Sequence, residues 1–567
     1  MALLAERIEF SQIAAPAPDM IEVAQEYAAI EAALATDDVA AKLAAIARWD
    51  DLRRRVLTWD NLTGLRFQQD TSNAEYRKAK EAADELAPKL TDLEVGLKRR
   101  LIADPRRADL EAAIGVHAFR LWECDITTFD PAIEADLVRE SKVRDEYTAI
   151  MAAAKISFRG QTLNLPQIGK YLDDADRETR HAAERARWAF FTEHASELDR
   201  IYDDLVKLRH GMARKLGYEN FIGLGYQLMQ RVDYNQHDVE RYRDQIAEYV
   251  VPIAQKIIER VARDHGIERT MFWDESVLDP KGNPEPRGGA DWIVAQARTA
   301  FAELAPELGD FFTRLSGQHL VDLDARPSKA QGGFCTSFPM YGWPFIFTNF
   351  NGTSGDVRVL VHETGHAFQS FRSRNLRLAD YLHPTYESCE IHSMGLEYLS
   401  WPQMERFFGE DAERYRRLHI ADAILFLPYG VAVDHFQHLV YAKPEATSAE
   451  RHAMWQEVER RYLPWRAYGD LAHAAKGGLW QEKRHIYLRP FYYIDYTLAL
   501  CCALQFWARS QDDHAATLAD YVALCDRGGG APFQELVASA NLQSPFTSGT
   551  LAKVMKRVRT TLELDPS

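Results

Sequence analysis

The spacing of apolar residues is the feature that most restricts the fold of this chain. Apolar side chains recur every three or four positions over residues 21–49, 74–101, 132–155, 176–216 and 238–264. This spacing places them on one face of an α-helix, and the intervening residues are mostly Ala, Glu, Lys and Arg, which are strong helix formers. The pattern returns after Gly355 and continues to the end of the chain, with an interruption at residues 528–530. The sequence therefore predicts a mainly α fold.

Two short segments depart from the helical pattern. Apolar residues alternate on both sides of Arg159-Gly160, which predicts a hairpin within residues 155–165. Residues 332–350 are rich in aromatic and β-forming residues and contain glycine and proline at intervals, which predicts a small β-sheet. A chain of 567 residues has room for more than one domain. We expect an N-terminal helical region over residues 1–190 and a second region over residues 191–567.

Composition excludes several classes of protein. The chain has 84 Asp and Glu against 68 Lys and Arg, a net charge of -16, and no basic patch, so we expect neither nucleic acid nor a membrane as a partner. Six cysteines without CxxC spacing predict free thiols. The first 19 residues lack the apolar core of a signal peptide, and the most apolar stretch, residues 496–508, is shorter than the roughly 20 residues that span a bilayer. We expect a cytoplasmic protein.

Residues 362–366 read His-Glu-Thr-Gly-His, an H-E-x-x-H motif. On a helix, His362 and His366 lie one turn apart on the same face, about 6 Å between Cβ atoms, so both imidazoles can bind one cation. Glu363 projects beside the pair, where it can hold a water without binding the metal. Two neutral imidazoles, a carboxylate and one open position are typical of catalytic zinc. The motif also occurs by chance on ordinary helices, so a third ligand is needed to support a metal site.

Acidic residues that could provide the third ligand follow within residues 386–397. Glu387, Glu390 and Glu397 share a face if this segment is helical. Their neighbours are apolar, and a carboxylate in apolar surroundings is costly to desolvate unless it is paired with a cation. These features together predict a metal site, with Glu387 and Glu390 as alternatives for the third ligand.

The motifs resemble those of a known family. Residues 349–366 are similar to the active-site helix of the oligoendopeptidase F and thimet oligopeptidase family of zinc metallopeptidases, and residues 390–397 to its second motif, a ligand Glu followed by Ser three residues on and Glu seven residues on. Further similar segments are residues 163–172, 209–220 and 528–539. The resemblance selects Glu390 over Glu387 and implies one zinc ion bound by His362, His366 and Glu390. Thr364 departs from the bulkier residue usual in the family, and Glu390 lies one position nearer to His366 than in the thimet branch.

The resemblance also implies roles for aromatic residues in the segment 485–496. In the family, a His and Tyr residues at this place face the zinc and hydrogen-bond the tetrahedral intermediate. Tyr496 matches best, followed by His485, whereas Tyr492 and Tyr493 are ambiguous because the spacing differs by about one residue. An aromatic stripe in the core would contain the same residue types.

Two further carboxylates are candidates by position alone. Each ligand histidine should donate its other ring N–H to an oxygen atom behind it, and Glu397 and Asp356 lie near enough in sequence to accept. Solvated carboxylates on the helix surface are the alternative.

The family fold implies a two-lobed helical metallopeptidase with a deep central channel that admits unfolded oligopeptides. The implied activity is hydrolysis of internal peptide bonds by attack of a zinc-bound water, with Glu363 as the general base. Gly332 and Gly333, ahead of the predicted sheet, are compatible with an extended substrate that adds to an edge strand, and equally with a plain turn.

Two other functions remain open from the sequence. A zinc exopeptidase, such as a peptidyl-dipeptidase or carboxypeptidase, needs a cation near the zinc for the substrate carboxylate, and Arg484 and Arg489 are candidates. A non-catalytic peptide-binding helical protein with a vestigial zinc site is the second, but a purely structural site has no use for a general base such as Glu363. The sequence predicts no particular oligomeric state.

Overall fold

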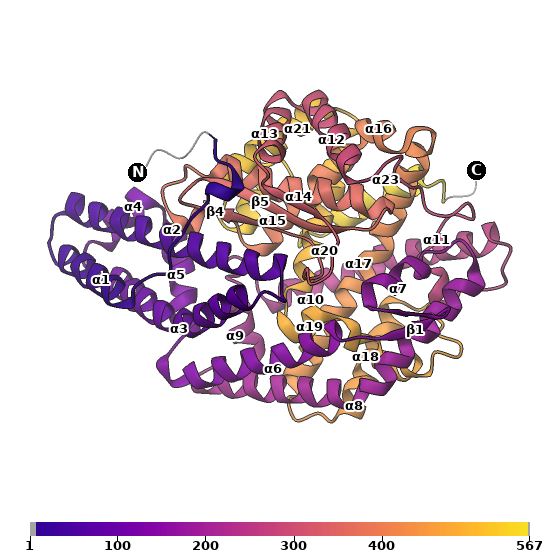
Figure 1. Cartoon of the computed structure of the whole chain (residues 1–567), viewed down its shortest axis with the longest axis horizontal. Helices are drawn as coiled ribbons and strands as arrows, with labels where there is room; N and C mark the ends of the chain where they lie inside the picture. The colour runs from indigo at the N-terminus through magenta and orange to yellow at the C-terminus, as the bar shows by residue number, and fades with distance from the viewer. Residues whose placement is uncertain (1–6, 565–567) are drawn as a thin grey trace.

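A computed structural model describes residues 7–564 and shows that these residues are mainly helical, as the apolar spacing predicts (Figure 1). The first half of the chain forms α1 (Met20–Leu34), α2 (Val39–Gln69), α3 (Ala74–Ile102), α4 (Arg107–Ile114), α5 (Val116–Thr128), α6 (Glu134–Ala152), α7 (Leu165–Leu172), α8 (Arg177–Lys215), α9 (Phe221–Leu228), α10 (Gln236–Gln245), α11 (Val251–Asp264), α12 (Ala290–Leu304) and α13 (Pro306–Gly317). The second half forms α14 (Ser354–Ser373), α15 (Tyr386–Leu399), α16 (Met404–Phe408), α17 (Ala412–Ala442), α18 (Ser448–Tyr462), α19 (Arg484–Leu488), α20 (Tyr493–Ser510), α21 (His514–Arg527), α22 (Phe533–Ser539) and α23 (Thr550–Thr561). None of the helices within residues 7–564 combines the length and the apolar character needed to cross a membrane.

The single helix predicted over residues 21–49 is divided in two. α1 ends at Leu34, and α2 begins after Asp38, whose carboxylate accepts a hydrogen bond from the N–H of Ala40 at 3.0 Å. Asp is a preferred residue at this position because its side chain binds an otherwise unpaired N–H group of the first turn. The apolar spacing continues without interruption across residues 35–38. For this reason the spacing alone does not reveal the break between the two helices.

The predicted hairpin and small sheet are both present. β1 (Ile156–Phe158) and β2 (Gln161–Leu163) pair antiparallel around Arg159 and Gly160. A second sheet has the strand order β3-β5-β4, where β3 (Val321–Asp324) is parallel to β5 (Trp343–Phe350) and β4 (Phe334–Phe338) is antiparallel to it. The sequence pattern did not reveal β3, which is only four residues long. β4 is an edge strand of this sheet, and β5 leads into α14.

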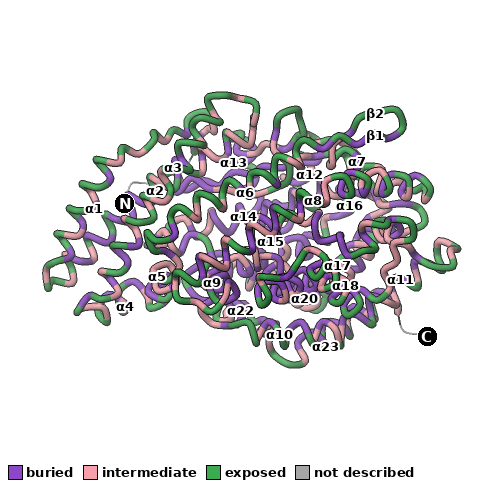
Figure 2. The backbone as a smooth tube through the Cα atoms, turned by 90° about the horizontal axis from the view of Figure 1, so that it is seen from below, coloured by how far each residue is buried: buried purple, intermediate pink, exposed green. Residues whose placement is uncertain are grey.

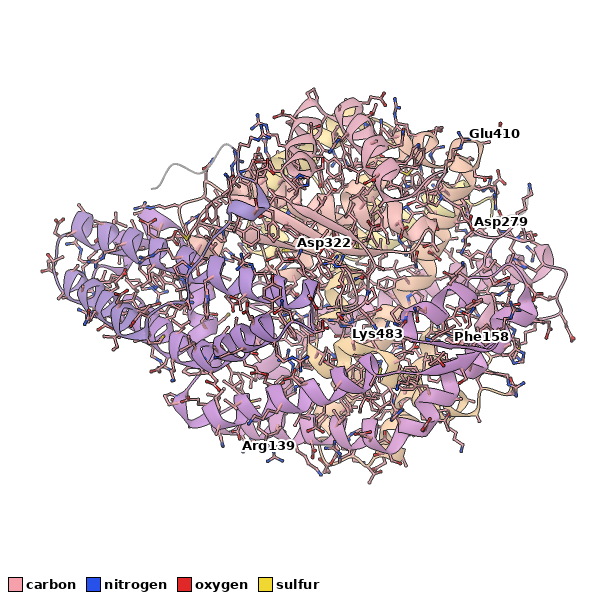
Figure 3. All side chains as sticks on the ribbon, viewed as in Figure 1. Arg139, Phe158, Asp279, Asp322, Glu410 and Lys483 are labelled. Atoms are coloured by element: carbon pink, nitrogen blue, oxygen red, sulfur yellow. The ribbon has the colours of Figure 1, made fainter. Side chains whose placement is uncertain are left out.

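The loop that precedes β4 is held by Asp322 on β3, which is labelled in Figure 3. Its carboxylate accepts hydrogen bonds from Arg326 at 2.6 and 2.8 Å and from the Lys329 ammonium at 2.8 Å. Burial raises the pKa of Asp322, but these hydrogen bonds outweigh burial and lower the pKa to about 2. The loop that ends in Gly332 is therefore fixed to the sheet.

Buried apolar residues form two clusters. The smaller one consists of residues from α1–α5 together with Leu378 and Tyr381, and the larger one contains the central helices α14, α15, α17 and α20. Figure 2 shows that buried residues concentrate around these central helices. Residue 190, where we expect the first region to end, lies inside α8.

The connector between α14 and α15, residues 374–385, is clamped by the N-terminal helices. The carboxylate of Asp380 on this connector pairs with Arg53 of α2 at 2.7 Å and accepts a hydrogen bond from the Trp122 indole of α5 at 3.1 Å. The Tyr381 hydroxyl, also on the connector, donates to the carbonyl of Ile114 at 2.9 Å and accepts from the N–H of Ala118 at 3.0 Å.

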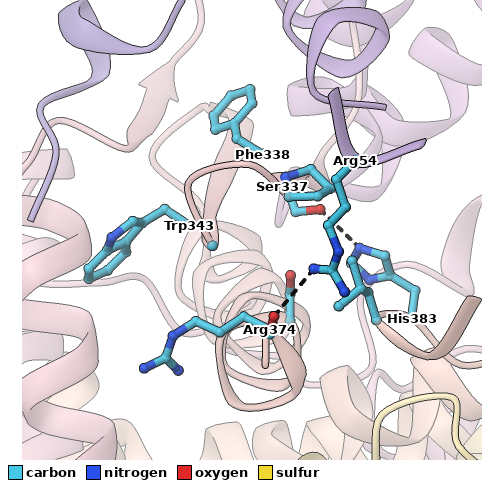
Figure 4. Close-up of a pocket in the computed structure, with 10 residues that line it drawn as sticks. Arg54, Ser337, Phe338, Trp343, Arg374 and His383 are labelled. Carbon is cyan, nitrogen blue, oxygen red and sulfur yellow. Dashed lines mark hydrogen bonds between the residues drawn. The ribbon is translucent and has the colours of Figure 1, made fainter. Parts of the chain in front are cut away.

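Arg54 of α2 binds the same connector. Its guanidinium donates to the carbonyl oxygens of Leu376 at 2.8 Å and Arg374 at 3.5 Å. Figure 4 shows Arg54 with Arg374 in a small pocket, where His383 of the connector also bonds the Ser337 hydroxyl of β4 at 2.9 Å. The connector is thus tied to both the N-terminal helices and the sheet.

Replacing Asp380 by Asn tests whether the clamp stabilises the protein. Burial alone would raise the pKa of Asp380, but Arg53 and Lys98 outweigh it and lower the pKa from 3.8 to about 2. Because the folded-state pKa is the lower one, the charge stabilises the fold above the unfolded-state pKa, and this stability is lost as the pH falls towards 2. We expect Asp380→Asn to lower the free energy of unfolding by about 2 kcal/mol at neutral pH and by about half as much near pH 3, measured by urea unfolding.

Asp526→Asn is the matched control. Asp526 pairs with Arg372 at the surface, with the Asp side chain 47% exposed, and surface pairs typically contribute about 0–1 kcal/mol. If Asp380→Asn costs no more than Asp526→Asn, or if its cost does not shrink at low pH, the clamp does not stabilise the fold in this way.

Candidate metal centre

The turn from β5 into α14 is closed by Asp356. Its carboxylate accepts hydrogen bonds from the N–H groups of Asn351 at 2.9 Å and Gly352 at 2.7 Å, and Gly352 has a φ of 88°, a conformation that favours glycine. An acidic residue in the first turn also interacts favourably with the helix dipole. Asp356, expected behind a ligand histidine, therefore holds the start of α14 instead of bonding to His362 or His366.

α14 presents both histidines of the H-E-x-x-H motif on one face. The ring centroids of His362 and His366 lie 5.0 Å apart, at an interplanar angle of 81°. Thr364, between them in sequence, points away and is fully buried, and its hydroxyl donates to the carbonyl of Leu360 at 2.7 Å. The small residue at this position fits against the helix's own backbone.

α15 crosses α14 in direct backbone contact at Gly365. A Cβ atom at this position would lie 2.7 Å from the Cα of Ser393 and would collide with the carbonyl oxygen of His392. Only glycine lets the two helices approach this closely. The contact places Glu390, one turn before Ser393, opposite the histidine pair.

Glu390 meets both histidines through one oxygen atom. Its Oε2 lies 3.3 Å from Nε2 of His362 and 3.4 Å from Nε2 of His366. Ser393 donates to the same Oε2 at 2.9 Å, and the hydroxyl of Tyr492 donates to Oε1 at 2.6 Å. Among residues 7–564, these three side chains are the one group of His, Cys, Asp or Glu whose ligand atoms converge, all within 4.8 Å of one another. Two imidazole nitrogens and a carboxylate oxygen suit zinc.

The ionisation of Glu390 and His362 is coupled to metal binding. Burial raises the pKa of Glu390, but the two histidines outweigh burial and hold the pKa well below its ordinary value. Burial lowers the pKa of His362, but hydrogen bonds to Glu390 and Glu397 outweigh burial and raise it. A metal must displace the protons that these groups hold in its absence, which couples metal affinity to pH.

Glu363 lies beside the three ligands with a free oxygen atom. The residue is 5% exposed, and its Oε2 is buried without a hydrogen-bond partner. Burial raises the pKa of Glu363, and the neighbouring histidines oppose part of this rise. A Cβ atom on Gly333 would lie 3.3 Å from Oε1 of Glu363, so the segment ahead of β4 passes directly beside this carboxylate.

Glu397, a candidate by position alone, lies behind His362. Its Oε1 accepts a hydrogen bond from Nδ1–H of His362 at 2.7 Å, and its Oε2 accepts one from His419 at 2.9 Å. Burial raises the pKa of Glu397, but these two hydrogen bonds outweigh burial and lower the pKa to about 2. His419 belongs to α17 and has no motif around it, so no sequence pattern indicates this contact.

Four aromatic residues from α19, the turn that follows it and the start of α20 form one cluster. The ring of His485 lies 5.8 Å from Tyr492, 5.2 Å from Tyr493 and 5.9 Å from Tyr496. Tyr492 is bound to Glu390, and Tyr493 packs into the core against the ring of Tyr429. The side chain of Tyr496 is partly exposed, 4.8 Å from the ring of Tyr492.

His485 is neutral in this setting. Burial, together with Lys483, Arg484 and Arg489, lowers its pKa to about 3, and its Nδ1 is buried without a partner. Lys483, labelled in Figure 3, lies in the segment just before α19.

Arg484 and Arg489 are both exposed. Nη1 of Arg484 would lie 3.4 Å from a Cβ atom on Gly332, whose φ is 100°. Arg489 donates to the hydroxyl of Tyr386 at 2.9 Å. Arg484 is therefore the cation that borders the segment ahead of β4.

The fold and the centre together define a helical metallopeptidase with an H-E-x-x-H motif and a third, glutamate ligand. Residues 10–129 match the Peptidase M3 N-terminal domain, and residues 170–281 and 302–556 match Peptidase family M3. The chain belongs to peptidase family M3, whose members are zinc peptidases. No curated protein matches the sequence.

Solved structures show which members of the family this chain is similar to. A candidate oligoendopeptidase F solved at 3.1 Å shares 45% identity and a TM-score of 0.95, with 98% of this chain and 99% of that chain covered. PZ peptidase A with an inhibitor shares 42% identity and a TM-score of 0.95 over the same shares. A candidate oligoendopeptidase F from Bacillus anthracis str. Ames shares 40% identity and a TM-score of 0.91, with 99% of each chain covered. This protein is therefore an oligoendopeptidase-like member of family M3.

Replacing Gly365 by Ala tests whether the contact between α14 and α15 sets the metal centre. The added methyl group must push the two helices apart, which moves Glu390 away from the histidines. We expect the dissociation constant for zinc to rise by at least about tenfold, measured by competition with a chromophoric chelator. Gly211→Ala in α8, where no atom lies within 4 Å of the added Cβ, should leave zinc affinity unchanged. A folded Gly365→Ala protein with wild-type zinc affinity would refute the role of the contact.

Proposed function

We propose that this protein is a zinc-dependent endopeptidase that hydrolyses internal peptide bonds of unfolded oligopeptides, with His362, His366 and Glu390 holding one zinc ion. The observation that supports this most directly is the carboxylate of Glu363, which is buried beside the three ligands with one oxygen atom free. A structural metal site has no use for such a group, whereas a hydrolase needs a base there.

Glu363 acts as the general base and acid. Zinc, when bound, supplies a Lewis acid that polarises the scissile carbonyl and lowers the pKa of water. Glu363 takes a proton from the attacking water through its free Oε2 and delivers it to the leaving amine. Burial raises the pKa of Glu363, which makes its carboxylate a stronger base for the first of these two proton transfers.

Tyr496 donates a hydrogen bond to the developing oxyanion, with His485 in support. Tyr492 has its hydroxyl engaged with Glu390 at 2.6 Å, which suits it to orient the ligand rather than the substrate. Tyr496 lies next to it, is partly exposed, and keeps its proton because burial raises its pKa. A protonated phenol beside the metal ligands is the type of donor that stabilises such charge.

The substrate binds as an additional strand on the edge of β4 at its Gly333 end, since at the other end the carbonyl of Ser337 accepts a hydrogen bond from Asn61 of α2 at 2.9 Å. An edge strand offers unpaired backbone groups to an extended peptide. Gly333 keeps a side chain out of the space beside Glu363, and Gly332 keeps one out of the space beside Arg484. Recognition through backbone groups suits a peptidase for unfolded oligopeptides, which we expect to enter through the central channel that the family resemblance implies. The names of the oligoendopeptidase F relatives agree with this substrate class.

The first test uses a fluorescence-quenched peptide that is blocked at both ends. We expect zinc-loaded wild-type protein to cleave it at an internal bond, a chelator to abolish cleavage, and added zinc to restore it. Glu363→Gln should bind zinc with wild-type stoichiometry, measured by atomic absorption, and lose turnover by at least about a thousandfold. Near wild-type turnover of zinc-loaded Glu363→Gln would refute the role of Glu363.

The same peptide distinguishes an exopeptidase, the second candidate function. The exposed Arg484 beside Gly332 is placed to bind the carboxylate of a substrate terminus. An exopeptidase would leave the blocked peptide intact and cleave its unblocked counterpart, and Arg484→Ala would then raise KM for the unblocked peptide alone.

Paired substitutions separate the two tyrosines. Tyr496→Phe should lower kcat by roughly a hundredfold to a thousandfold without changing zinc affinity, because it removes a donor to the transition state. Tyr492→Phe should instead weaken zinc binding about tenfold, because Glu390 loses a hydrogen bond, and should retain most of kcat at saturating zinc. Zinc titration and steady-state kinetics of the two proteins measure both effects. If Tyr492→Phe lowers kcat and Tyr496→Phe weakens zinc binding, Tyr492 is the oxyanion donor and Tyr496 orients Glu390.

A further inference from the structure

A chain of buried hydrogen bonds runs from His362 away from the metal ligands and ends at a tryptophan. Nδ1–H of His362 donates to Oε1 of Glu397 at 2.7 Å, and Nε2 of His419 lies 2.9 Å from Oε2 of the same carboxylate. Nδ1 of His419 then accepts a hydrogen bond from the indole N–H of Trp401 at 3.1 Å. Glu397, His419 and Trp401 are each at most 9% exposed.

The tryptophan and the carboxylate together determine which ring nitrogens of the two histidines donate. An indole nitrogen can only donate, so Nδ1 of His419 must be the acceptor. A neutral imidazole carries one proton, which leaves N–H at Nε2 of His419, and this group donates to Glu397. Glu397 accepts at both oxygen atoms, so His362 carries its proton at Nδ1. The nitrogen of His362 that remains for a metal is therefore Nε2, which lies 3.3 Å from Oε2 of Glu390.

Packing holds the middle of the chain in one orientation. The ring of His419 is stacked on Tyr398, with centroids 4.6 Å apart and an interplanar angle of 7°, and lies 5.6 Å from the ring of Tyr415. Trp401 follows α15 directly, in the short turn Trp401–Gln403. The chain of hydrogen bonds therefore joins α14, α15 and α17 through buried, closely packed groups.

We propose that His419 and Trp401 are positioning residues that hold Glu397 in place and thereby fix the tautomer of His362 that binds the metal. The proposal concerns metal binding alone and does not depend on which peptide bonds the enzyme cleaves. A neutral histidine that populates two tautomers can bind a metal through Nε2 only in the tautomer that is protonated at Nδ1. In this arrangement His362 populates that tautomer alone.

Trp401→Phe removes the terminal donor and retains an aromatic ring. We expect the dissociation constant for zinc to rise about threefold to tenfold, measured with zinc alone in competition with a chromophoric chelator. His419→Phe should raise it about tenfold to a hundredfold, because Glu397 loses a donor.

Another tryptophan of the protein, Trp480, provides a matched control for Trp401→Phe. The indole N–H of Trp480 also lies 3.1 Å from Nδ1 of a histidine, His452, and Trp480 is fully buried. Trp480→Phe therefore removes the same kind of interaction from a residue pair that has no hydrogen bond to Glu397 or His362. It should leave zinc affinity within about twofold of wild type.

A double-mutant cycle separates tautomer control from general support of the fold. In Glu397→Gln, the side chain has one acceptor and one donor, so it cannot accept from both histidines. Its amide donor then faces the Nε2–H of His419, which Trp401 forces into place. Removing the Trp401 N–H lets His419 move its proton to Nδ1 and accept from the amide. We therefore expect Trp401→Phe to weaken zinc binding in the wild-type background and to leave it unchanged, or strengthen it, in Glu397→Gln.

The outcomes are distinct. If Trp401→Phe weakens zinc binding by the same factor in both backgrounds, or no more than Trp480→Phe does, the tautomer proposal is overturned. Should His419→Phe fail to fold, the Trp401 and Glu397 cycle still decides the question. Because zinc affinity is the readout, a failure to detect peptide cleavage would count against the proposed endopeptidase and not against this assignment.

Discussion

The metal centre depends on the backbone contact between α14 and α15. The two histidines are fixed by helical geometry within α14, but Glu390 comes from another helix and must be brought to them. Gly365 allows this, because the absence of a side chain lets the carbonyl of His392 and the Cα of Ser393 lie against α14. A carboxylate oxygen consequently lies 3.3 and 3.4 Å from the two imidazole nitrogens.

Other parts of the fold hold each ligand in the orientation that this contact makes possible. Tyr492 and Ser393 bind the two oxygen atoms of Glu390, and Glu397 binds the far nitrogen of His362. The connector between the two helices is held from the N-terminal side through Asp380 and neighbouring residues. The centre is therefore supported by helices that are distant from it in the sequence.

Sequence patterns predicted the features that depend on residues close together in the chain. Helical spacing identified most helices, and the motif with the neighbouring acidic segment identified the converging group, with the family resemblance selecting Glu390. β3 was missed because four residues are too few to show alternation, and the break at Asp38 because the apolar spacing continues across it. Tyr492 bonds to Glu390 and His419 bonds to Glu397 from different helical segments. The spacing of residues within one helix therefore cannot predict these contacts. Asp356 lies near the motif in sequence, but the turn before α14 takes its hydrogen bonds.

Residues 10–129 cannot be detached from the remainder without cost, although they match a separate family segment. Leu378 and Tyr381 of the connector belong to the apolar cluster of α1–α5, so excision would expose both to water. The carbonyl of Leu376 would also lose its guanidinium donor. The segment that carries the ligands is thus not a transplantable module. A chimaera that exchanges residues 10–129 between relatives must also exchange the connector that these residues bind.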